Sequence, residues 1–254
     1  MNVLVCVKRV PITGGRITLT PDEQEIDTRY LGFTISPHEE CGVEEAVRLI
    51  EGHGGASVVL TLGPPEAEEQ LRDAMALGVD RAVLLETDGA DWGPIATARA
   101  IARAILDEET ANGVFDLVLF GNEAADSGDY QVGVRVAHAL GRPCITGAKA
   151  IEVGERGVVA RREVSGGWEV FELPLPAVLT VNEGLNLPRY PSIPGRLKSK
   201  KKPVERIAPE RAPDGQRKLG LVLPPGRAKQ AVVLGSGPET APKVVQVLRK
   251  AGVL

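Results

Sequence analysis

The sequence predicts an α/β protein with a parallel central sheet, an antiparallel meander at the sheet edge and a C-terminal arm. Strand-like and helix-like segments alternate four times in about 140 residues, which is typical of a parallel sheet covered on both faces. After Pro143 the pattern changes to short strands in which apolar and polar residues alternate. After Val181 the chain becomes rich in proline, glycine and basic residues, which predicts an extended arm.

The first half of the chain supplies the strands and helices of the parallel sheet. Buried strands are expected at 2–8, 56–62, 81–86 and 117–120, with a short edge strand at 16–20. Helices are expected where apolar residues recur at helical spacing or where proline and glycine mark the ends, namely at 43–50, 64–78, 95–106 and from about Asp129 onward.

The second half supplies the meander and the arm. Three alternating strands are expected at 148–153, 157–164 and 168–173. A last buried strand follows at 177–181, and a short helix at 241–251 ends the chain. The sequence thus predicts two parts: a nucleotide-binding α/β domain over 1–183, and a docking loop and arm over 184–254 that pack on a partner.

The composition excludes several function classes. The chain has 254 residues and a net charge of −4, which argues against a general nucleic-acid binder. No apolar run approaches the roughly 20 residues of a membrane span, and the N-terminus lacks the pattern of a signal peptide. The three cysteines lack CxxC spacing, so we expect a cytoplasmic protein with reduced thiols.

The most informative segment is the strand–loop–helix unit DLVLFGNEAADSGDYQVGVR, residues 116–135. Gly121 and Gly128 allow the backbone to approach a ligand closely, and the new helix offers free N–H groups to an anion. The unit therefore predicts a phosphate cradle and hence a nucleotide. Asp126 and Asp129 are expected to cap the helix or to bind ribose hydroxyls. The alternative is an ordinary capped loop.

Other chemical motifs are weak or absent. The sequence has no G-x-G-x-x-G after the first strand, no Walker A motif and no G-x-S-x-G. His38, His53 and His138 lack metal-ligand spacing, so no metal site is expected. Of the three, only His38, directly before a helix, is a candidate for ligand contact. No nucleophile–base pair stands out, which predicts a binding protein and not an enzyme.

The assembled segments resemble the beta subunit of electron-transfer flavoprotein over nearly the whole chain. The resemblance is carried by VLVCVKRV, VEEAVRL, DLVLFGNEAADSGDYQVG, REVSGG and LPAVLTVNEGLNLPRYPSIPGRLKSKKK. The last segment is long and its residues follow the same order as in the family, which makes the resemblance specific.

The resemblance implies a Rossmann-like fold of the adenine-nucleotide-hydrolase type. It implies a heterodimer with an alpha subunit that holds most of an FAD. The FAD would accept electrons from acyl-CoA dehydrogenases and pass them to a membrane quinone oxidoreductase, as in fatty acid beta-oxidation. The beta subunit itself would bind a structural AMP. Carried over by position, the AMP site comprises Cys6, Ser36, Pro37, His38, Glu39, Leu62, Gly121, Asn122, Glu123, Ala124, Ala125, Asp126, Ser127, Gly128, Asp129, Tyr130, Gln131 and Val132.

The docking loop of the family corresponds to residues 186–202, with Ile193 at the position of a large aliphatic anchor. An apolar anchor inside a basic ring suits a partner interface, because the anchor supplies affinity and the charges steer encounter. The alternative is that Ile193 packs back on its own subunit. The expected docking residues are Arg189, Tyr190, Ile193, Arg196 and Lys198.

Two departures from the family pattern leave alternatives open. Thr13 and His38 stand where members often carry aromatic residues that lie toward the flavin. The loop SGDYQVG also differs from the commoner run of acidic residues. A related subgroup binds a second FAD in place of AMP and bifurcates electrons. A free-standing nucleotide-binding stress-type module of similar fold is the other alternative, although it would explain only about the first 145 residues.

Overall fold

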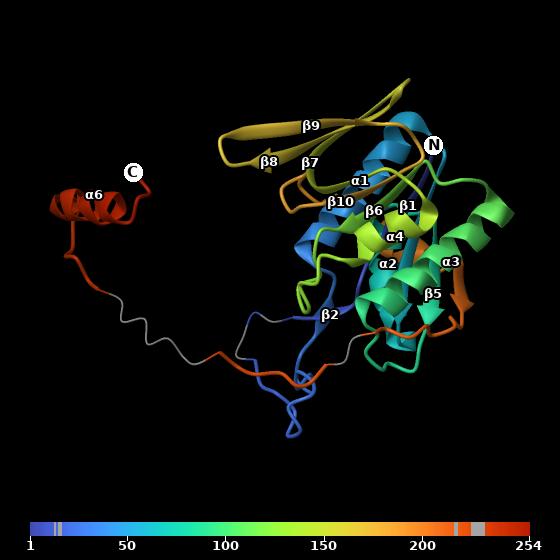
Figure 1. Ribbon diagram of the computed structural model, residues 1–254, viewed down its shortest axis with the longest axis horizontal. Helices are drawn as coiled ribbons and strands as arrows, with labels where there is room; N and C mark the ends of the chain where they lie inside the picture. The colour runs from blue at the N-terminus through green and yellow to red at the C-terminus, as the bar shows by residue number, and fades with distance from the viewer. Residues whose placement is uncertain (13, 15–16, 216–217, 225–231) are drawn as a thin grey trace.

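The computed structural model describes the chain of 254 residues except 13, 15–16, 216–217 and 225–231. Among the described residues, one sheet has the strand order β11-β5-β4-β1-β6-β10-β7-β8-β9 (Figure 1). Neighbours from β11 to β7 are parallel, and the pairs β7–β8 and β8–β9 are antiparallel. The expected α/β fold class is confirmed.

The central parallel strands are short apolar runs whose side chains are buried on both faces of the sheet. In β1, Val3 and Val5 pack in one hydrophobic cluster, whereas Leu4 and Cys6 pack in the other, because successive side chains point to opposite faces. The bounds are β1 Asn2–Cys6, β4 Ala56–Gly63, β5 Arg81–Glu86, β6 Leu117–Gly121 and β10 Ala177–Val181.

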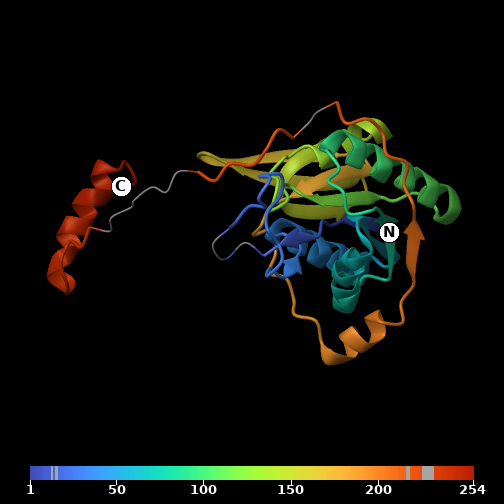
Figure 2. The same ribbon diagram turned by 90° about the horizontal axis from the view of Figure 1, so that it is seen from below.

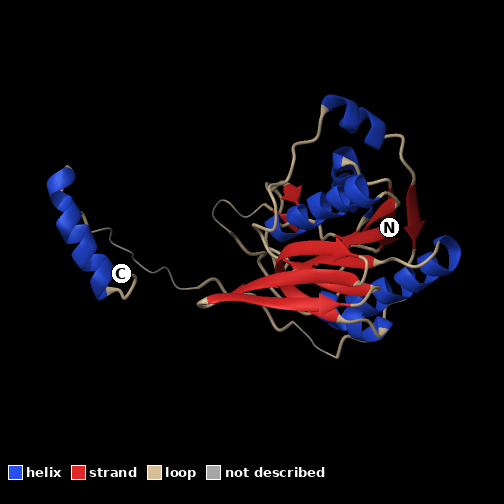
Figure 3. Ribbon diagram, turned by 90° about the horizontal axis from the view of Figure 1, so that it is seen from above, coloured by secondary structure: helices blue, strands red, loops and turns tan. Residues whose placement is uncertain are grey.

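Helices cover both faces of this sheet (Figure 3). One face is covered by α1 (Pro37–His53) and α2 (Glu68–Leu77), which follows the 3₁₀ turn η1 (Pro65–Ala67). The other face is covered by α3 (Pro94–Asn112) and α4 (Val132–Leu140). The four expected strand–helix alternations are therefore present. The helix expected at 43–50 begins earlier, because Ser36 is its N-cap and Pro37 suits the first helical position.

The expected antiparallel meander is also present at the sheet edge. It consists of β7 (Cys144–Gly154), β8 (Gly157–Val164) and β9 (Gly167–Leu173). β7 begins earlier than expected because its first residues pair in parallel with β10, after which the strand continues into its antiparallel pairing with β8.

Two elements after Val181 were not expected from the sequence, and one strand expected in the first half is wrong. A short helix, α5 (Ile193–Ser199), lies within the docking segment, and β11 (Val204–Ile207) pairs in parallel with β5. The edge strand expected at 16–20 is not formed over 17–20, where Leu19 makes only an isolated bridge to Ile26; Arg16 is outside the described residues. The nearby pairing is a small separate sheet of β2 (Val10–Pro11) and β3 (Phe33–Thr34).

The C-terminal arm ends in the expected helix. It comprises the 3₁₀ turn η2 (Pro238–Thr240) and α6 (Ala241–Lys250), and α6 lies apart from the α/β body in Figures 1 and 2. Val244, Val245 and Val247 are exposed, and α6 has no buried residue. Within the described part of the chain, no helix combines the length and apolar character needed to cross a membrane.

Candidate functional site

The candidate site lies at the carboxyl ends of β1 and β6. From β1 the chain first builds β4 and β5 on one side, and then returns to place β6 on the other side of β1. The helices change faces at the same point, since α1 and α2 pack on one face and α3 and α4 on the other. In open α/β sheets, ligands bind in the crevice at such a topological switch point.

Glu39 forms the floor of this site. It is 5% exposed, and its Oε1 accepts a hydrogen bond from Lys8 N–H at 2.9 Å while its Oε2 accepts from Ser36 N–H at 3.0 Å. The carboxylate therefore ties the start of α1 to the residues after β1. Burial raises the pKa of Glu39 to about 8 and outweighs these hydrogen bonds, which favour the charged form.

Replacing Glu39 by glutamine should flatten the dependence of stability on pH. A raised pKa means that the folded state holds a proton that the unfolded state releases between about pH 4.5 and 8, so the free energy of unfolding falls as pH rises through that window. The expected loss is on the order of 4 kcal/mol. Melting temperatures at pH 5 and pH 8 measure it. Glu155→Gln, in the exposed turn between β7 and β8, is the control. An equal fall in Glu39→Gln and wild type would contradict the assignment.

The loop after β6 requires glycine at two positions. A Cβ built on Gly121 would lie 2.7 Å from Glu39 Cγ, so only glycine permits this close approach of the loop to α1. Gly128 has φ +60°, a left-handed conformation that other L-residues rarely adopt. Tyr130 shares that conformation at φ 56°, which strains the backbone just before α4.

Several contacts close this loop onto the start of α1. Ser36 Oγ donates to the carbonyl of Glu123 at 3.2 Å, and Lys8 Nζ lies 2.7 Å from Asp126 Oδ2. His38 Nε2 lies 3.3 Å from Glu123 Oε1, and its Nδ1 accepts from Glu183 N–H at 3.0 Å. His38 therefore joins the loops that follow β6 and β10. With Nδ1 as acceptor, the hydrogen of the neutral ring is on Nε2.

No side chain caps the start of α4. Its N-cap is Gln131, whose side chain accepts from Arg135 instead of from the helix N–H groups. Neither Asp126 nor Asp129 caps this helix, so that half of the expectation is wrong, while ribose binding by these residues stays a prediction. Asp126 accepts from Ser127 N–H and pairs with Lys8, and the helix begins only at Val132, three residues after Asp129. Free N–H groups at a helix start favour an anion.

The apolar members of the expected site meet beside this loop. Cys6 is buried in the cluster against which Leu62 and Val132 pack. Burial, with Glu39 nearby, raises the pKa of the Cys6 thiol, which therefore stays protonated. Thr13, one of the two residues that depart from the family pattern, lies outside the described residues.

Taken together, these contacts show that the structure brings the ends of the strands, residues 36–39 and the loop 121–132 to one place.

Two residues of this region were missed by the sequence reasoning. Lys8 follows β1 directly, a position where the carboxyl end of a parallel strand could have marked it as a site residue. Thr180 donates to Asn122 Oδ1 at 2.7 Å and accepts from Gly147 N–H at 3.0 Å, which joins β10 to the loop. The contacts of Thr180 depend on which strands are neighbours in the sheet, and the local sequence pattern does not reveal this order. Among the described residues, no group of three His, Cys, Asp or Glu side chains could hold a metal ion.

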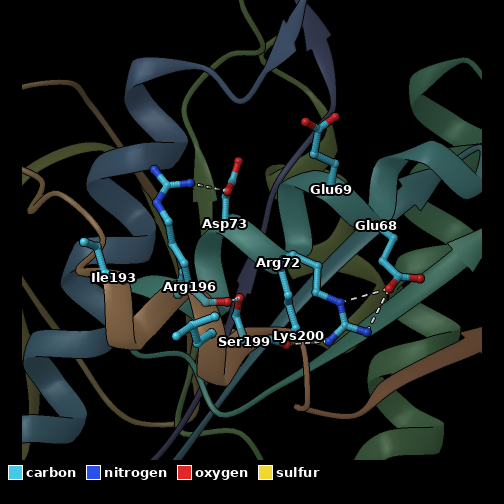
Figure 4. Close-up of a pocket in the computed structure, with 10 residues that line it drawn as sticks. Glu68, Glu69, Arg72, Asp73, Ile193, Arg196, Ser199 and Lys200 are labelled. Carbon is cyan, nitrogen blue, oxygen red and sulfur yellow. Dashed lines mark hydrogen bonds and ion pairs between the residues drawn. The ribbon is translucent and has the colours of Figure 1, made fainter.

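The docking segment is held at both ends, by Arg189 at one end and at the other by Lys202, whose Nζ donates to the carbonyl of Val79 at 2.6 Å. Arg189 donates to Glu44 Oε2 at 2.9 Å and to Glu51 Oε1 at 2.6 Å, so its guanidinium fixes the segment to α1 and is not a free rim charge. Between these fixed points Tyr190 is 96% and Ile193 77% exposed. Ile193 therefore does not pack back on its own subunit. Arg196 reaches toward Asp73 of α2 at 3.9 Å, as Figure 4 shows.

The fold and site define an α/β protein in which loops and helix starts converge at the topological switch point of the sheet. Comparison with known proteins adds the family. The family model described as "Electron transfer flavoprotein domain" matches residues 25–212. This chain belongs to the electron transfer flavoprotein family.

The curated relatives are named as beta subunits. The chain is 36% identical to the "Electron transfer flavoprotein subunit beta" of Bacillus subtilis over 258 residues, covering 98% of each chain. It is 37% identical to that of Syntrophomonas wolfei, covering 90% of this chain and 88% of the relative. It is 34% identical to the human one, covering 99% and 98%. These names describe subunits of an electron transfer flavoprotein, in agreement with the expected electron-transfer role.

Proposed function

We propose that this chain is the beta subunit of a heterodimeric electron carrier and that it binds one structural AMP. The observation that carries the AMP assignment is the uncapped start of α4 beside the loop 121–132, at the switch point of the sheet. Lys8 supplies a positive charge at the same edge, and Cys6 with Leu62 supplies apolar surface for an adenine ring. The ligand's phosphate would meet N–H groups, while its base would meet the strand ends.

The proposed heterodimer has an alpha subunit that holds most of the FAD. The beta-subunit names of the relatives imply such a second chain. The arm supports the assembly, because α6 has an apolar face of Val244, Val245 and Val247 that the α/β body leaves uncovered. An exposed apolar face on the end of an arm is typical of a segment that packs on a partner.

In the proposed route, electrons pass through the FAD and not through side chains of this chain. Acyl-CoA dehydrogenases would dock on the segment around Ile193 and donate electrons, which would then pass to a membrane quinone oxidoreductase. The exposure of Tyr190 and Ile193 supports docking here. The free-standing module considered above is set aside, because the family match extends to residue 212 and so includes the meander and the docking segment.

The nucleotide content of the purified heterodimer tests the proposal. Heat-released supernatant should contain one AMP and one FAD per heterodimer. FAD in twofold excess over the dimer, with no AMP, would favour the electron-bifurcating alternative, in which a second FAD occupies the same loop. Absence of any adenine nucleotide from the loop would contradict both.

Gly128→Val should weaken AMP binding. Gly128 has φ +60°, and forcing a β-branched residue into this conformation costs of order 1–3 kcal/mol, which favours a change in the backbone of the loop that we propose holds AMP. The expected result is a loss of AMP affinity of roughly tenfold or more, with poorer assembly and little change in flavin absorbance. AMP released per heterodimer is the measurement.

Gly141→Val is the matched control. Gly141 has φ +63° at the far end of α4, and nothing lies within 4 Å of a Cβ built there. It suffers the same backbone strain away from the loop, so this variant should lose stability while retaining its AMP. Equal AMP loss in both variants would assign the effect to global destabilisation and not to the loop.

A further inference from the structure

The C-terminal arm is fastened to the α/β body along a stretch that follows β11. In Figures 1 and 2 this stretch passes the start of α3 and then the connection between β2 and β3, before the arm continues toward α6. Residues 211–214 contact the start of α3, and residues 218–221 contact the connection. We call these two groups of residues the strap.

Asp214 of the strap caps the start of α3, although it lies more than a hundred residues further along the chain. The N-cap residue of α3 is Gly93, which has no side chain to accept a hydrogen bond from the helix. Asp214 Oδ1 accepts from Ala96 N–H at 2.8 Å, and its Oδ2 accepts from Gly93 N–H at 3.2 Å. A carboxylate there satisfies N–H groups that lack a helical partner and suits the positive end of the helix dipole. α3 therefore takes its cap from the arm.

Gly93 leaves the room that this carboxylate occupies. A Cβ built on Gly93 would lie 2.8 Å from both Cγ and Oδ1 of Asp214. The φ of Gly93 is −69°, a value that any residue adopts, so the backbone does not itself require glycine. The Asp214 side chain is therefore what excludes a larger residue, and the two positions fit each other only when the strap is closed.

Two basic side chains extend the strap on either side of this carboxylate. Arg211 Nη2 donates to the carbonyl of Asp91 at 2.6 Å, and its guanidinium carbon lies 5.3 Å from the centroid of the Trp92 ring. Lys218 Nζ lies 2.7 Å from Glu25 Oε1 and 3.2 Å from Asp91 Oδ2. Lys218 thus joins the loop before α3 to the connection between β2 and β3.

The strap is also bound through its backbone. Leu221 N–H donates to the carbonyl of Glu23 at 2.7 Å, and Gln24 Nε2 donates to the carbonyl of Leu219 at 3.2 Å. Backbone hydrogen bonds do not depend on side-chain rotamers, so they fix the path of the chain as well as its charge contacts. The arm is therefore held on two separate segments of the α/β body.

We propose that the strap fixes the point from which the arm leaves the α/β body, and that Asp214 is the positioning residue that holds the strap closed. The closure stands on the contacts above, whereas its consequence for assembly rests on the proposed heterodimer. An open strap would add its own residues to the length of chain between the body and α6. The effective concentration of α6 at the alpha subunit falls as that length grows, so closure should speed assembly by about twofold.

Limited digestion of the full-length chain by trypsin measures closure, because cleavage after Arg211 requires the strap to open. Asp214→Ala should speed this cleavage by about fivefold, the factor that corresponds to loss of a helix cap. Asp214→Asn keeps an acceptor oxygen and should stay close to wild type. Asp107→Ala, the same truncation on α3 itself, is the control and should not change the rate.

Gly93→Ala tests the same contact from the side of the body. Its methyl group would overlap with the Asp214 carboxylate, so this variant should speed cleavage after Arg211 without any change in the arm. The double variant Gly93→Ala with Asp214→Ala should be cleaved no faster than the faster of the two, because both act on one contact. Gly52→Ala is the matched control, since nothing lies within 4 Å of a Cβ built there on α1.

Cleavage at a second site distinguishes opening of the strap from general unfolding. Arg81 is at the start of β5, inside the sheet, so cleavage after it reports unfolding of the body and should keep the wild-type rate in every variant. An equal rise after Arg81 and Arg211 would overturn the inference. So would a wild-type rate after Arg211 in both Asp214→Ala and Gly93→Ala.

Assembly is measured by mixing each variant with purified alpha subunit. Asp214→Ala and Gly93→Ala should associate about twofold more slowly than wild type, and Asp214→Asn at the wild-type rate. Faster cleavage with unchanged association would overturn the role of the strap in assembly. If wild type does not associate with an alpha subunit at all, the proposed heterodimer fails, while the cleavage rates still decide whether Asp214 closes the strap.

Discussion

Made without its alpha subunit, this chain should carry no stoichiometric flavin, whereas co-expression should yield a yellow one-to-one complex. The sequence has no dinucleotide-binding G-x-G-x-x-G motif after β1. The candidate site centres on a single loop, 121–132, which suits a mononucleotide. The apolar face of α6 has no cover in the single chain. Absorbance of the flavin relative to protein, before and after co-expression, is the measurement.

Two variants of α6 sharpen this test. Val247 is on the apolar side of the helix, and Gln246 is on the opposite side. Val247→Asp should impair assembly and so lower the flavin yield, whereas Gln246→Asp should assemble normally. A stable isolated chain fully loaded with flavin would contradict the proposed division of the cofactor between the subunits.

Ile193→Ala should lower the affinity of the heterodimer for an acyl-CoA dehydrogenase at least tenfold. Ile193 is 77% exposed at the start of α5, between two fixed ends of the docking segment, so little of its apolar surface is buried before the partner binds. Truncating an interface anchor costs ~2 kcal/mol or more, which corresponds to this loss. Electron transfer should therefore slow at subsaturating partner concentration.

The same variant should leave the rest of the molecule unchanged. Its AMP content, flavin absorbance and assembly should match wild type, and dithionite should reduce its flavin normally, because Ile193 is exposed on α5, which packs on α2, whereas the loop 121–132 contacts Lys8 and the start of α1. Transfer at the wild-type rate under subsaturating partner would refute the docking role. Loss of flavin would instead show that Ile193 supports the subunit interface.

The sequence predicted the central sheet well and the docking segment poorly, for reasons that particular residues make clear. The strands at 81–86 and 177–181 have the expected bounds, since each is built around a short apolar run, Ala82–Leu85 in the first and Ala177–Leu179 in the second. β11 was missed because Val204-Glu205-Arg206-Ile207 carries charges at its centre, as an edge strand can. α5 was missed because Pro194 and Gly195 suggest a loop, although proline suits a first turn and Ser192 caps it.

The candidate site could be predicted where its signal is local. The loop 121–132 contains its own glycines and leads directly into a helix, so the sequence indicated it. The pairing of Lys8 with Asp126 and that of Arg189 with Glu44 join residues more than a hundred positions apart. Such contacts depend on the strand order, and single-sequence patterns do not encode it. Arg189 was therefore expected to face a partner, whereas it fixes its own subunit.

β11 has a consequence for how the protein is made. Among the described residues it is the last strand of the sheet, yet it covers the edge of β5, a strand completed more than a hundred residues earlier. A growing chain on the ribosome therefore has an open parallel edge at β5 until residue 207 has been synthesised. An unpaired edge is a template for pairing with other chains. The interval between β5 and β11 is thus a period in which the edge of β5 is open to pairing with other chains.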